Sequence, residues 1–248
     1  MKTSEFTLYR DYDIKCKLFQ PDNGDIERII LGVHGFAGDK ESSVLSALAE
    51  EMQEHKTALV CFDFPAHGAS EADETYFTVV NCKRDLLTVA KWANETYQNA
   101  EKTVFATSFG GYISLLCAKE LSGFSFVLRA PAVTMPKVLT ESVLKIPPAE
   151  FQRQKSVDCG FERKINLPYA FYEELLQYDP VNAEYSRKIL IIHGDRDDIV
   201  PYTDILSFCK KHPSITLMAI AGADHRFKKD GELAQIIKLT KDFILQSN

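Results

Sequence analysis

The feature that most constrains the fold is an alternation along the chain of short apolar runs with longer amphipathic stretches. Parallel strands covered on both faces appear as continuous apolar runs, and each connection between them needs the length of a helix. The alternation therefore predicts an α/β fold with a mostly parallel central sheet and helices on both faces. The expected buried strands are Ile29–Val33, Ala58–Phe62, Thr103–Ala106, Phe126–Leu128, Ile189–Ile192 and Thr216–Ile220.

The N-terminal segment and the amphipathic stretches complete this expected domain. Glu5–Tyr9 and Ile14–Phe19 flank a polar turn, which predicts an antiparallel hairpin. The 248 residues fit a single domain, residues 1–248, large enough for a sizeable core. Apolar residues recur at helical spacing in four stretches, expected as helices at 42–55, 79–97, 113–121 and 233–245.

One connection is much longer than the others. About 60 residues separate the expected strand at Leu128 from the one at Ile189, whereas a crossover with its helix needs only a dozen or more. The segment holds six of the ten prolines, and its aromatic residues follow no period that would place them all in the main core. Long insertions of this kind are functional lids or disordered segments, and the aromatic content favours an ordered lid at residues 133–184.

The strongest chemical signal is the segment Val104–Tyr112, which reads VFATSFGGY. An apolar run leads through Ser108 into a helical stretch, with the small residues Ala106 and Gly110 two positions before and after the serine. This is the layout of a nucleophile elbow, a turn so sharp that only small side chains fit around the exposed hydroxyl. The usual pattern is G-x-S-x-G, and the methyl group of Ala106 is close to hydrogen in size. The alternative interpretation is a serine that caps a helix.

A nucleophilic serine needs a base, and the base needs an orienting acid. In the elbow architecture these follow the serine in the order Asp or Glu, then His. Downstream, an expected strand enters the acidic turn HGDRDDIVP, which contains three aspartates. Asp197 is the predicted acid, because the frame H-G-x-x-D-x-x-V-P places it within the loop rather than at the strand end. The alternative role for Asp195 and Asp198 is to form the turn and cap the helix that starts near Pro201.

His225 is the predicted base among six histidines. It lies in a loop after the last expected strand, 28 residues beyond the predicted acid. His55 and His212 are expected at helix ends on the surface. His193 precedes a turn glycine and His67 lies in the turn after the second parallel strand, and both are expected to have structural roles.

An acyl-transfer site also needs donors for the oxyanion that develops on the attacked carbonyl. The first parallel strand is followed by HGFAG at residues 34–38, where glycines allow close backbone approach. The backbone N–H groups of Phe36 and Phe109 are the expected pair, and an ordinary glycine-rich turn is the alternative. Neither GxxxxGK[ST] nor GxGxxG occurs, which argues against a phosphate loop. No HExxH motif or Cys/His cluster occurs either, so no metal site is expected.

Composition and charge restrict the class of partner. The formal net charge is −6 with mixed signs along the chain, whereas nucleic-acid binding needs a basic stripe. No apolar run approaches the length of a membrane span, and the N-terminus has no apolar signal core. The six cysteines form no CxxC pair and most lie in apolar segments, which favours reduced thiols and a cytoplasmic location. A homodimer is compatible with these observations.

Together these motifs resemble those of the α/β-hydrolase superfamily, and more closely of small bacterial serine esterases related to feruloyl (cinnamoyl) esterases and monoacylglycerol lipases. The resemblance covers nearly the whole chain. The matching segments are the oxyanion loop at 34–38, the D-x-x-G/A-H-G-x-S turn at 63–70, the elbow at 106–111, the L-x-A-P-A segment at 128–132, the acid turn at 193–197 and the histidine loop at 222–225.

The resemblance implies hydrolysis of a small-molecule carboxylic ester through an acyl-serine intermediate, without a cofactor. It also implies a small lid over the acyl pocket, where Tyr169, Phe171 and Tyr172 are the expected substrate-binding residues. Similar proteins commonly have His before the nucleophile and Gln after it, where this chain has Thr107 and Phe109. This difference makes the oxyanion wall more apolar, and the lid sequence departs most from the family, so a hydroxycinnamoyl ester is one substrate among several.

Two rival interpretations remain open at the level of sequence. The same triad also performs amide or peptide hydrolysis, thioester cleavage and acyl transfer. A non-catalytic ligand-binding protein that retains the fold is the rival from another class.

Overall fold

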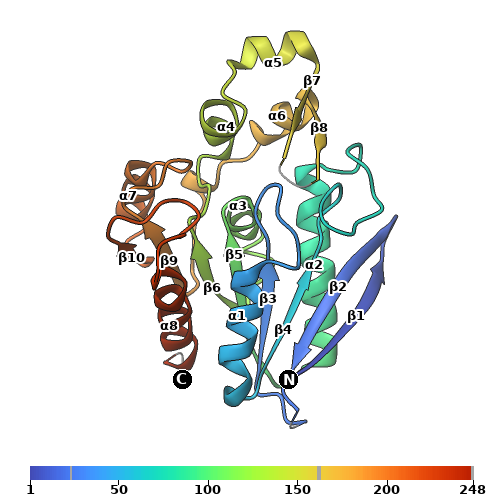
Figure 1. Ribbon diagram of the computed structural model, residues 1–248, viewed down its shortest axis with the longest axis vertical. Coiled ribbons are helices and arrows are strands. Elements are labelled where there is room, and N and C mark those ends of the chain that lie inside the picture. The colour runs from blue at the N-terminus through green and yellow to red at the C-terminus, as the bar shows by residue number, and fades with distance from the viewer. Residues whose placement is uncertain (23, 161–162, 247–248) are drawn as a thin grey trace.

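The computed structural model describes residues 1–22, 24–160 and 163–246. Its central element is a sheet with the strand order β1-β2-β4-β3-β5-β6-β9-β10. The two pairings that involve β2 are antiparallel, and the remaining neighbours in this sheet pair in parallel (Figure 1). The expected mostly parallel sheet and N-terminal hairpin are therefore confirmed. The strands are β1 (Lys2–Tyr9), β2 (Asp13–Gln20), β3 (Arg28–Val33), β4 (Thr57–Phe62), β5 (Glu101–Thr107), β6 (Phe124–Arg129), β9 (Ile189–Gly194) and β10 (Thr216–Ile220).

Helices cover both faces of the sheet, as the apolar runs predict. α1 and α8 pack against each other over one face, where they share an apolar cluster with one side of the central strands. α2 and α3 contribute to a larger cluster on the other face. The helices of this framework are α1 (Ser43–Met52), η1 (Gln53–His55), α2 (Val79–Thr96), α3 (Phe109–Leu116), α7 (Tyr202–Lys211) and α8 (Glu232–Leu245).

Two expected elements differ from the observed ones. The strand Thr216–Ile220 is not buried, because β10 lies at the edge of the sheet; Ile220 is buried, whereas Met218 is 43% exposed. The helix expected at 113–121 is α3, which begins four residues earlier, at Phe109, and ends at Leu116. Gly110 and Gly111 belong to this helix and do not interrupt it, because their missing side chains allow close packing against neighbouring segments.

The long connection between β6 and β9 forms a separate layer above the carboxyl ends of the parallel strands (Figure 1). We call residues 133–184 the insertion. Phe161, one of its aromatic residues, lies outside the described residues. The elements of the insertion are α4 (Met135–Lys137), η2 (Val138–Val143), α5 (Pro148–Gln154), β7 (Ser156–Cys159), β8 (Ile165–Pro168), α6 (Tyr169–Leu175) and η3 (Pro180–Asn182), with β7 and β8 paired antiparallel.

The insertion is attached to the framework by ring packing and by polar contacts. Phe171 stacks on Phe77, which precedes α2, with ring centroids 4.6 Å apart. Glu174 accepts hydrogen bonds from the first two N–H groups of α2, those of Val79 (2.7 Å) and Val80 (2.9 Å). The aromatic residues of the insertion divide between two environments: Phe151, Phe171 and Tyr172 belong to the cluster on the α2 and α3 face, whereas Tyr169 and Tyr178 are only partly buried against it.

Candidate active site

Ser108 lies in a strained turn between β5 and α3. Its backbone has φ 51° and ψ −113°, a conformation that residues other than glycine seldom adopt and that is maintained only when the surroundings enforce it. Two hydrogen bonds do so: the Ser108 N–H donates to Arg129 O (2.9 Å), and the Ala132 N–H donates to Ser108 O (3.1 Å). The hydroxyl therefore occupies a fixed position at the carboxyl edge of the sheet, and the side chain does not cap α3.

Glycines join this turn to the loop after β3. A Cβ atom at Gly110 would lie 2.4 Å from His34 O, a distance that no side chain tolerates. A Cβ at Gly35 would lie 3.3 Å from the Ser108 Cβ. The start of α3 and the loop after β3 thus pack backbone to backbone, which brings Phe36 and Phe109 to the same end of the site, with their rings 6.3 Å apart.

The three predicted triad residues meet although they are far apart in the sequence. His225 Nε2 lies 3.1 Å from Ser108 Oγ, and His225 Nδ1 lies 2.8 Å from Asp197 Oδ2. The Asp197 side chain is fully buried, whereas that of His225 is 13% exposed. This arrangement lets one imidazole exchange a proton with the serine hydroxyl while its other nitrogen is held by a carboxylate.

Asp197 is held in its ionised form by His225 and by donors from its own loop. Its Oδ1 accepts hydrogen bonds from the N–H groups of Ile199 (2.9 Å) and Val200 (2.7 Å). Burial opposes ionisation, but the contacts with His225, His193 and the Val200 N–H prevail and lower the pKa of Asp197. His193 bonds Val200 O through Nε2 (3.0 Å), and burial lowers its pKa, so this imidazole is neutral.

The neighbouring aspartates hold the histidine loop instead of capping a helix. Asp195 accepts a hydrogen bond from the Gly222 N–H (2.6 Å), and Asp198 accepts one from the His225 N–H (3.4 Å). α7 has Pro201 at its N-cap and no side-chain cap, so the alternative role of helix capping is not observed for these residues. Their common effect is to join the acid loop to the loop that carries His225.

The loop after β3 is supported by two neutral histidines. The Ala37 N–H donates to His67 Nε2 (3.0 Å), and the Phe64 N–H donates to His34 Nε2 (3.1 Å). Burial lowers the pKa of His34 to about 4 and that of His67 to about 3, so both nitrogens stay available as acceptors at neutral pH. Within the described part of the chain, neither predicted oxyanion donor, the N–H of Phe36 or of Phe109, donates to a protein acceptor.

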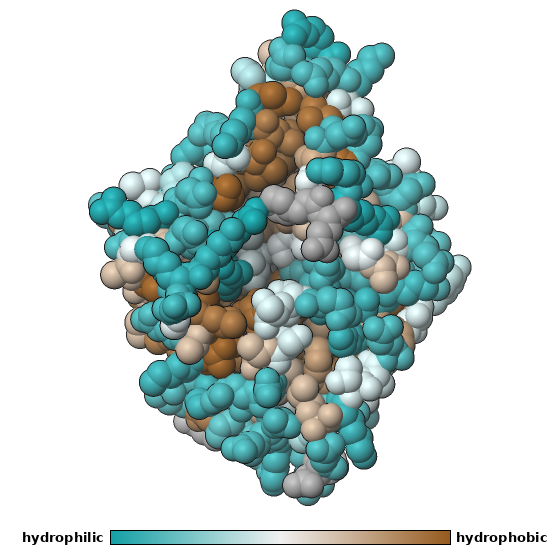
Figure 2. Space-filling model, in the orientation of Figure 1, coloured by the Kyte–Doolittle hydropathy of each residue, from teal (hydrophilic) through white to brown (hydrophobic). Residues whose placement is uncertain are grey.

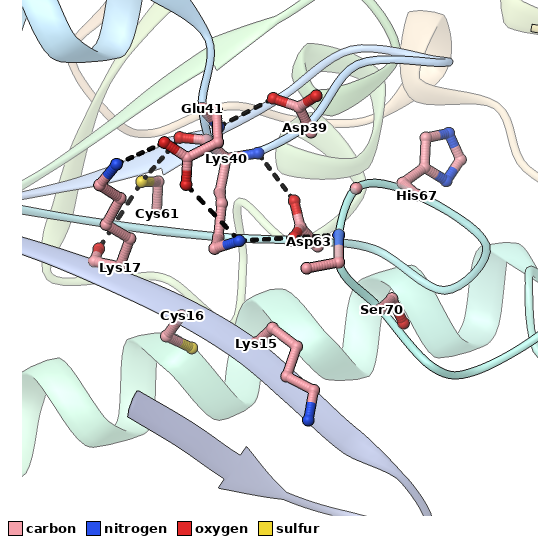
Figure 3. A network of polar contacts seen from close by, with 12 residues as sticks. Lys15, Cys16, Lys17, Asp39, Lys40, Glu41, Cys61, Asp63, His67 and Ser70 are labelled. Carbon is pink, nitrogen blue, oxygen red and sulfur yellow. Dashed lines mark hydrogen bonds and ion pairs between the residues drawn. The ribbon is translucent and has the colours of Figure 1, made fainter. Parts of the chain in front are cut away.

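A cavity of about 730 Å³, lined in part by charged side chains, lies beside these loops. Its lining includes Ala37 and Arg226, which directly follow Phe36 and His225. Lys40 and Asp63 form part of the wall: the Lys40 N–H donates to Asp63 Oδ1 (2.7 Å), and the ammonium group lies 3.2 Å from Oδ2 (Figure 3). Both side chains are buried, so this pair fixes the loop after β3 against the turn after β4.

The three residues expected to bind substrate lie in α6 of the insertion. Phe171 is 2% exposed, and its ring lies 6.0 Å from that of Phe109, the residue after the predicted nucleophile. Tyr172 is 8% exposed and reaches a second cavity of about 720 Å³ on the insertion. Tyr169 is half-buried and packs against Tyr172 and Phe151. Figure 2 shows an apolar surface on the insertion, beside a hollow above the centre of the molecule.

Like His55, which is also half-buried, His212 differs from its expected surface position. It is half-buried, its Nε2 lies 3.0 Å from Val181 O, and its ring packs between Tyr185 and Phe208. It does lie at a helix end, directly after α7. The residues that the structure describes include no group of three or more His, Cys, Asp or Glu side chains placed to hold a metal ion. None of the described helices is long and apolar enough to cross a membrane.

Sequence reasoning did not identify Arg129 and Glu174. The Arg129 side chain donates to Arg226 O next to His225 (2.9 Å), and Glu174 caps α2 from the insertion. Each acts on a partner more than 90 residues away. No local pattern around either residue signals such a contact.

Comparisons with known proteins identify the fold and the family of the chain. No curated protein sequence matches the chain. Est1E from Butyrivibrio proteoclasticus, solved with ferulic acid bound, superposes with a TM-score of 0.86 at 23% identity, covering 97% of this chain and 98% of its own. Mouse alpha/beta hydrolase domain-containing protein 10 has a TM-score of 0.77 at 18% identity, covering 99% of this chain and 100% of its own.

A third structure, XC6422 from Xanthomonas campestris, is described as a serine hydrolase without a lid. It has a TM-score of 0.72 at 17% identity and covers 99% of this chain and 94% of its own. At these identities the three structures show the α/β-hydrolase fold. The family model described as serine aminopeptidase, S33, matches residues 24–157, more than half of the sequence. The chain therefore belongs to the S33 serine aminopeptidase family of α/β hydrolases.

Proposed function

We propose that this protein is a serine esterase that cleaves carboxylic esters of small molecules through an acyl-serine intermediate. In this proposal Ser108 is the nucleophile, His225 the general base and Asp197 the acid that orients the base. One observation carries it: Ser108 Oγ, the two nitrogens of His225 and Asp197 Oδ2 form a continuous chain with separations of 3.1 and 2.8 Å. The strained backbone of Ser108 supports the same assignment, because strain of this kind concentrates at reactive groups.

Acylation would begin with the attack of Ser108 Oγ on the ester carbonyl carbon while His225 Nε2 takes the hydroxyl proton. The ionised Asp197 accepts the Nδ1–H, which keeps Nε2 unprotonated before attack and stabilises the imidazolium afterwards. The N–H groups of Phe36 and Phe109 receive the oxyanion. The imidazolium then gives its proton to the departing alcohol, and the acyl group remains on Ser108.

Deacylation repeats these steps with water in place of the serine. His225 removes a proton from a water molecule, whose oxygen attacks the acyl carbon, and the oxyanion forms again at the same N–H groups. When this intermediate collapses, Ser108 Oγ takes back the proton from His225 and the carboxylic acid is released. No cofactor takes part in either half of the proposed reaction.

The surroundings of the site support an ester with an apolar acyl part and a polar alcohol part. On the insertion, Phe171 and Tyr172 are the proposed contacts for an acyl or aryl group, with Tyr169 beside them, and the residues 133–184 then act as a lid. A cavity lined by charged side chains, among them Lys40, Asp63 and Arg163, is the proposed place for the alcohol part. Feruloyl and other cinnamoyl esters are substrates to test first, since the similar Est1E structure holds ferulic acid.

The proposal is tested by covalent labelling and by an ester panel. A fluorophosphonate should label the wild-type protein at Ser108 and leave Ser108→Ala unlabelled. Hydrolysis of p-nitrophenyl esters of rising acyl length, methyl ferulate and a monoacylglycerol would then identify the preferred acyl group. A wild-type protein that neither reacts with the fluorophosphonate nor hydrolyses any ester would contradict the proposal and favour a non-catalytic binding protein.

Peptide hydrolysis is the second proposed activity, because the matching family model is described as a serine aminopeptidase. The same triad serves it, with His225 protonating an amine leaving group. Aminoacyl p-nitroanilides compared with the p-nitrophenyl esters of the same acids distinguish the two activities. Turnover of the anilides at a kcat/KM equal to that of the esters would favour the peptidase. Thioester substrates and alcohol acceptors in the same assay would report thioesterase or acyltransferase activity.

We also propose a cytoplasmic location. All six cysteines have free thiols, and Cys16, Cys61, Cys82 and Cys117 are buried. Burial raises the pKa of these thiols, so they are protonated and unreactive at neutral pH. Retention of full activity in millimolar dithiothreitol would support a reducing compartment.

A further inference from the structure

Arg129 is a half-buried cation at the carboxyl end of β6, behind the catalytic loops. Among the described residues no carboxylate lies within ion-pair distance of its guanidinium group, and its buried Nε has no hydrogen-bond partner. Burying an arginine without a carboxylate partner is costly, and an apolar side chain would fill the end of a strand at lower cost. The burial of the Arg129 side chain is therefore not explained by a gain in stability.

The contacts of the Arg129 side chain all lead to the histidine loop. Its terminal nitrogen Nη2 donates to Arg226 O (2.9 Å), and Arg226 directly follows the catalytic histidine. The guanidinium carbon lies 4.7 Å from the centre of the Phe227 ring, which is a cation–π contact. Arg129 thus holds both residues that follow His225, from the side of the sheet that α1 and α8 cover.

The backbone around Arg129 contacts the elbow and the strand that precedes the Asp197 loop. Arg129 O accepts the hydrogen bond from the Ser108 N–H (2.9 Å). The next N–H, that of Ala130, donates to Ile192 O in β9, the strand that leads into the Asp197 loop (2.9 Å). Residues 129 and 130 therefore connect the elbow, strand β9 and the histidine loop.

We infer that Arg129 is a positioning residue, which holds His225 within proton-transfer distance of Ser108 by bonding the histidine loop to the elbow. The inference rests on the proposed hydrolase function. Charge supports it as well as geometry: Asp197 and Asp224 keep the guanidinium protonated although burial lowers the pKa of Arg129 to about 10. Displacement of a catalytic group by about 1 Å can cost about 100-fold in rate, so a small shift of this loop is enough to be measured.

The test compares Arg129→Met with Arg28→Met. Arg28 is also a half-buried arginine at a strand end and donates to a backbone carbonyl, His55 O, but it lies at the amino end of the parallel sheet. We expect Arg129→Met to lower kcat by about 10- to 100-fold with KM changed less than about twofold, because the loop acts on proton transfer and not on substrate binding. Fluorophosphonate labelling should slow by a similar factor, while Arg28→Met changes neither rate.

Two further variants keep the test decisive if Arg129→Met does not fold. Arg129→Lys retains one donor and the charge over Phe227, and should recover most of the lost kcat. Phe227→Leu removes only the ring face and should lower kcat less than Arg129→Met. A folded Arg129→Met enzyme with wild-type kcat, a loss confined to KM, or an equal loss in Arg28→Met would overturn the inference. A wild-type protein that neither labels nor turns over any substrate would instead refute the proposed function.

Discussion

The loops at the carboxyl edge of the sheet and the insertion face the same site from opposite sides, but they are held by different interactions. The loops are fixed by strained backbone, by glycines that admit direct backbone contact and by buried carboxylates such as Asp197. The insertion is attached through ring packing of Phe171 on Phe77 and through side-chain hydrogen bonds, among them one that Glu174 accepts from the Val79 N–H.

This difference predicts two kinds of response to mutation. A change in the edge loops moves reacting atoms, so it should affect every substrate and leave little activity. A change in the insertion alters apolar contacts or an attachment point, so it should affect some substrates more than others, or stability alone. The following experiments test that division, beginning with the largest effect.

Replacement of the proposed nucleophile or the proposed base should have the largest effect. We expect Ser108→Ala and His225→Ala each to lower kcat by about 10⁶-fold, because neither acylation nor deacylation proceeds without them. The two residues act as one unit, so the double variant should lose little more than either single one. Steady-state kinetics with p-nitrophenyl acetate measures this, with circular dichroism to verify folding. Additive losses in the double variant would contradict the assignment of Ser108 and His225 to one triad.

Replacement of the acid tests which aspartate orients the base. Asp197→Asn should lower kcat by about 10³- to 10⁴-fold, since the amide favours the wrong imidazole tautomer and cannot stabilise the imidazolium. Asp195→Asn and Asp198→Asn are the matched controls in the same loop. They accept bonds from the Gly222 and His225 N–H groups and should cost far less. A larger loss in either control than in Asp197→Asn would shift the acid to that residue.

The same division explains which parts could be predicted from the sequence. The elbow is recognisable because its constraints are local: a buried strand, Ser108 and small neighbours lie within nine residues. The order of acid and base in the chain is set by the sheet, so Asp197 and His225 could be proposed for these roles from strand positions alone. The attachment of the insertion has no such signal. Glu174 caps a helix 95 residues earlier in the chain, and a glutamate in an amphipathic segment looks like any solvated charge.

Truncation of aromatic residues in the insertion should have an intermediate and selective effect. We expect Phe171→Ala and Tyr172→Ala to lower kcat/KM more for bulky acyl or aryl esters than for p-nitrophenyl acetate. The difference should correspond to a loss of about 1–3 kcal/mol of transition-state binding free energy. An acetyl group has too little surface to reach the insertion. The ratio of the two specificity constants is the measurement, since it cancels any shared loss of folded enzyme.

Phe208→Ala is the control for this ratio. Phe208 is also buried, 1% exposed, but belongs to α7 and packs against Tyr185 and His212. Its truncation should destabilise the protein while leaving the ratio unchanged. If the ratio also stays constant in Phe171→Ala and Tyr172→Ala, the insertion does not determine specificity, and the pocket is formed by the loops around Phe36 and Phe109.

Removal of the attachment at Glu174 should have the smallest effect, and one on stability rather than catalysis. Glu174→Ala leaves the Val79 and Val80 N–H groups without their carboxylate acceptor. These groups lie at the N-terminal end of α2, where the helix dipole favours a negative charge. Loss of an N-cap acceptor costs about 1 kcal/mol, so the free energy of unfolding in urea should fall by that amount. Glu173→Ala, at an exposed position in the same helix as Glu174, should change the free energy of unfolding by less than about 0.5 kcal/mol.

Because Glu174 touches neither Ser108 nor the loops that hold it, kcat for p-nitrophenyl acetate should stay at the wild-type value in Glu174→Ala. A fall in kcat without a fall in stability would mean that the insertion positions the reacting groups, and the division between the two regions would not hold.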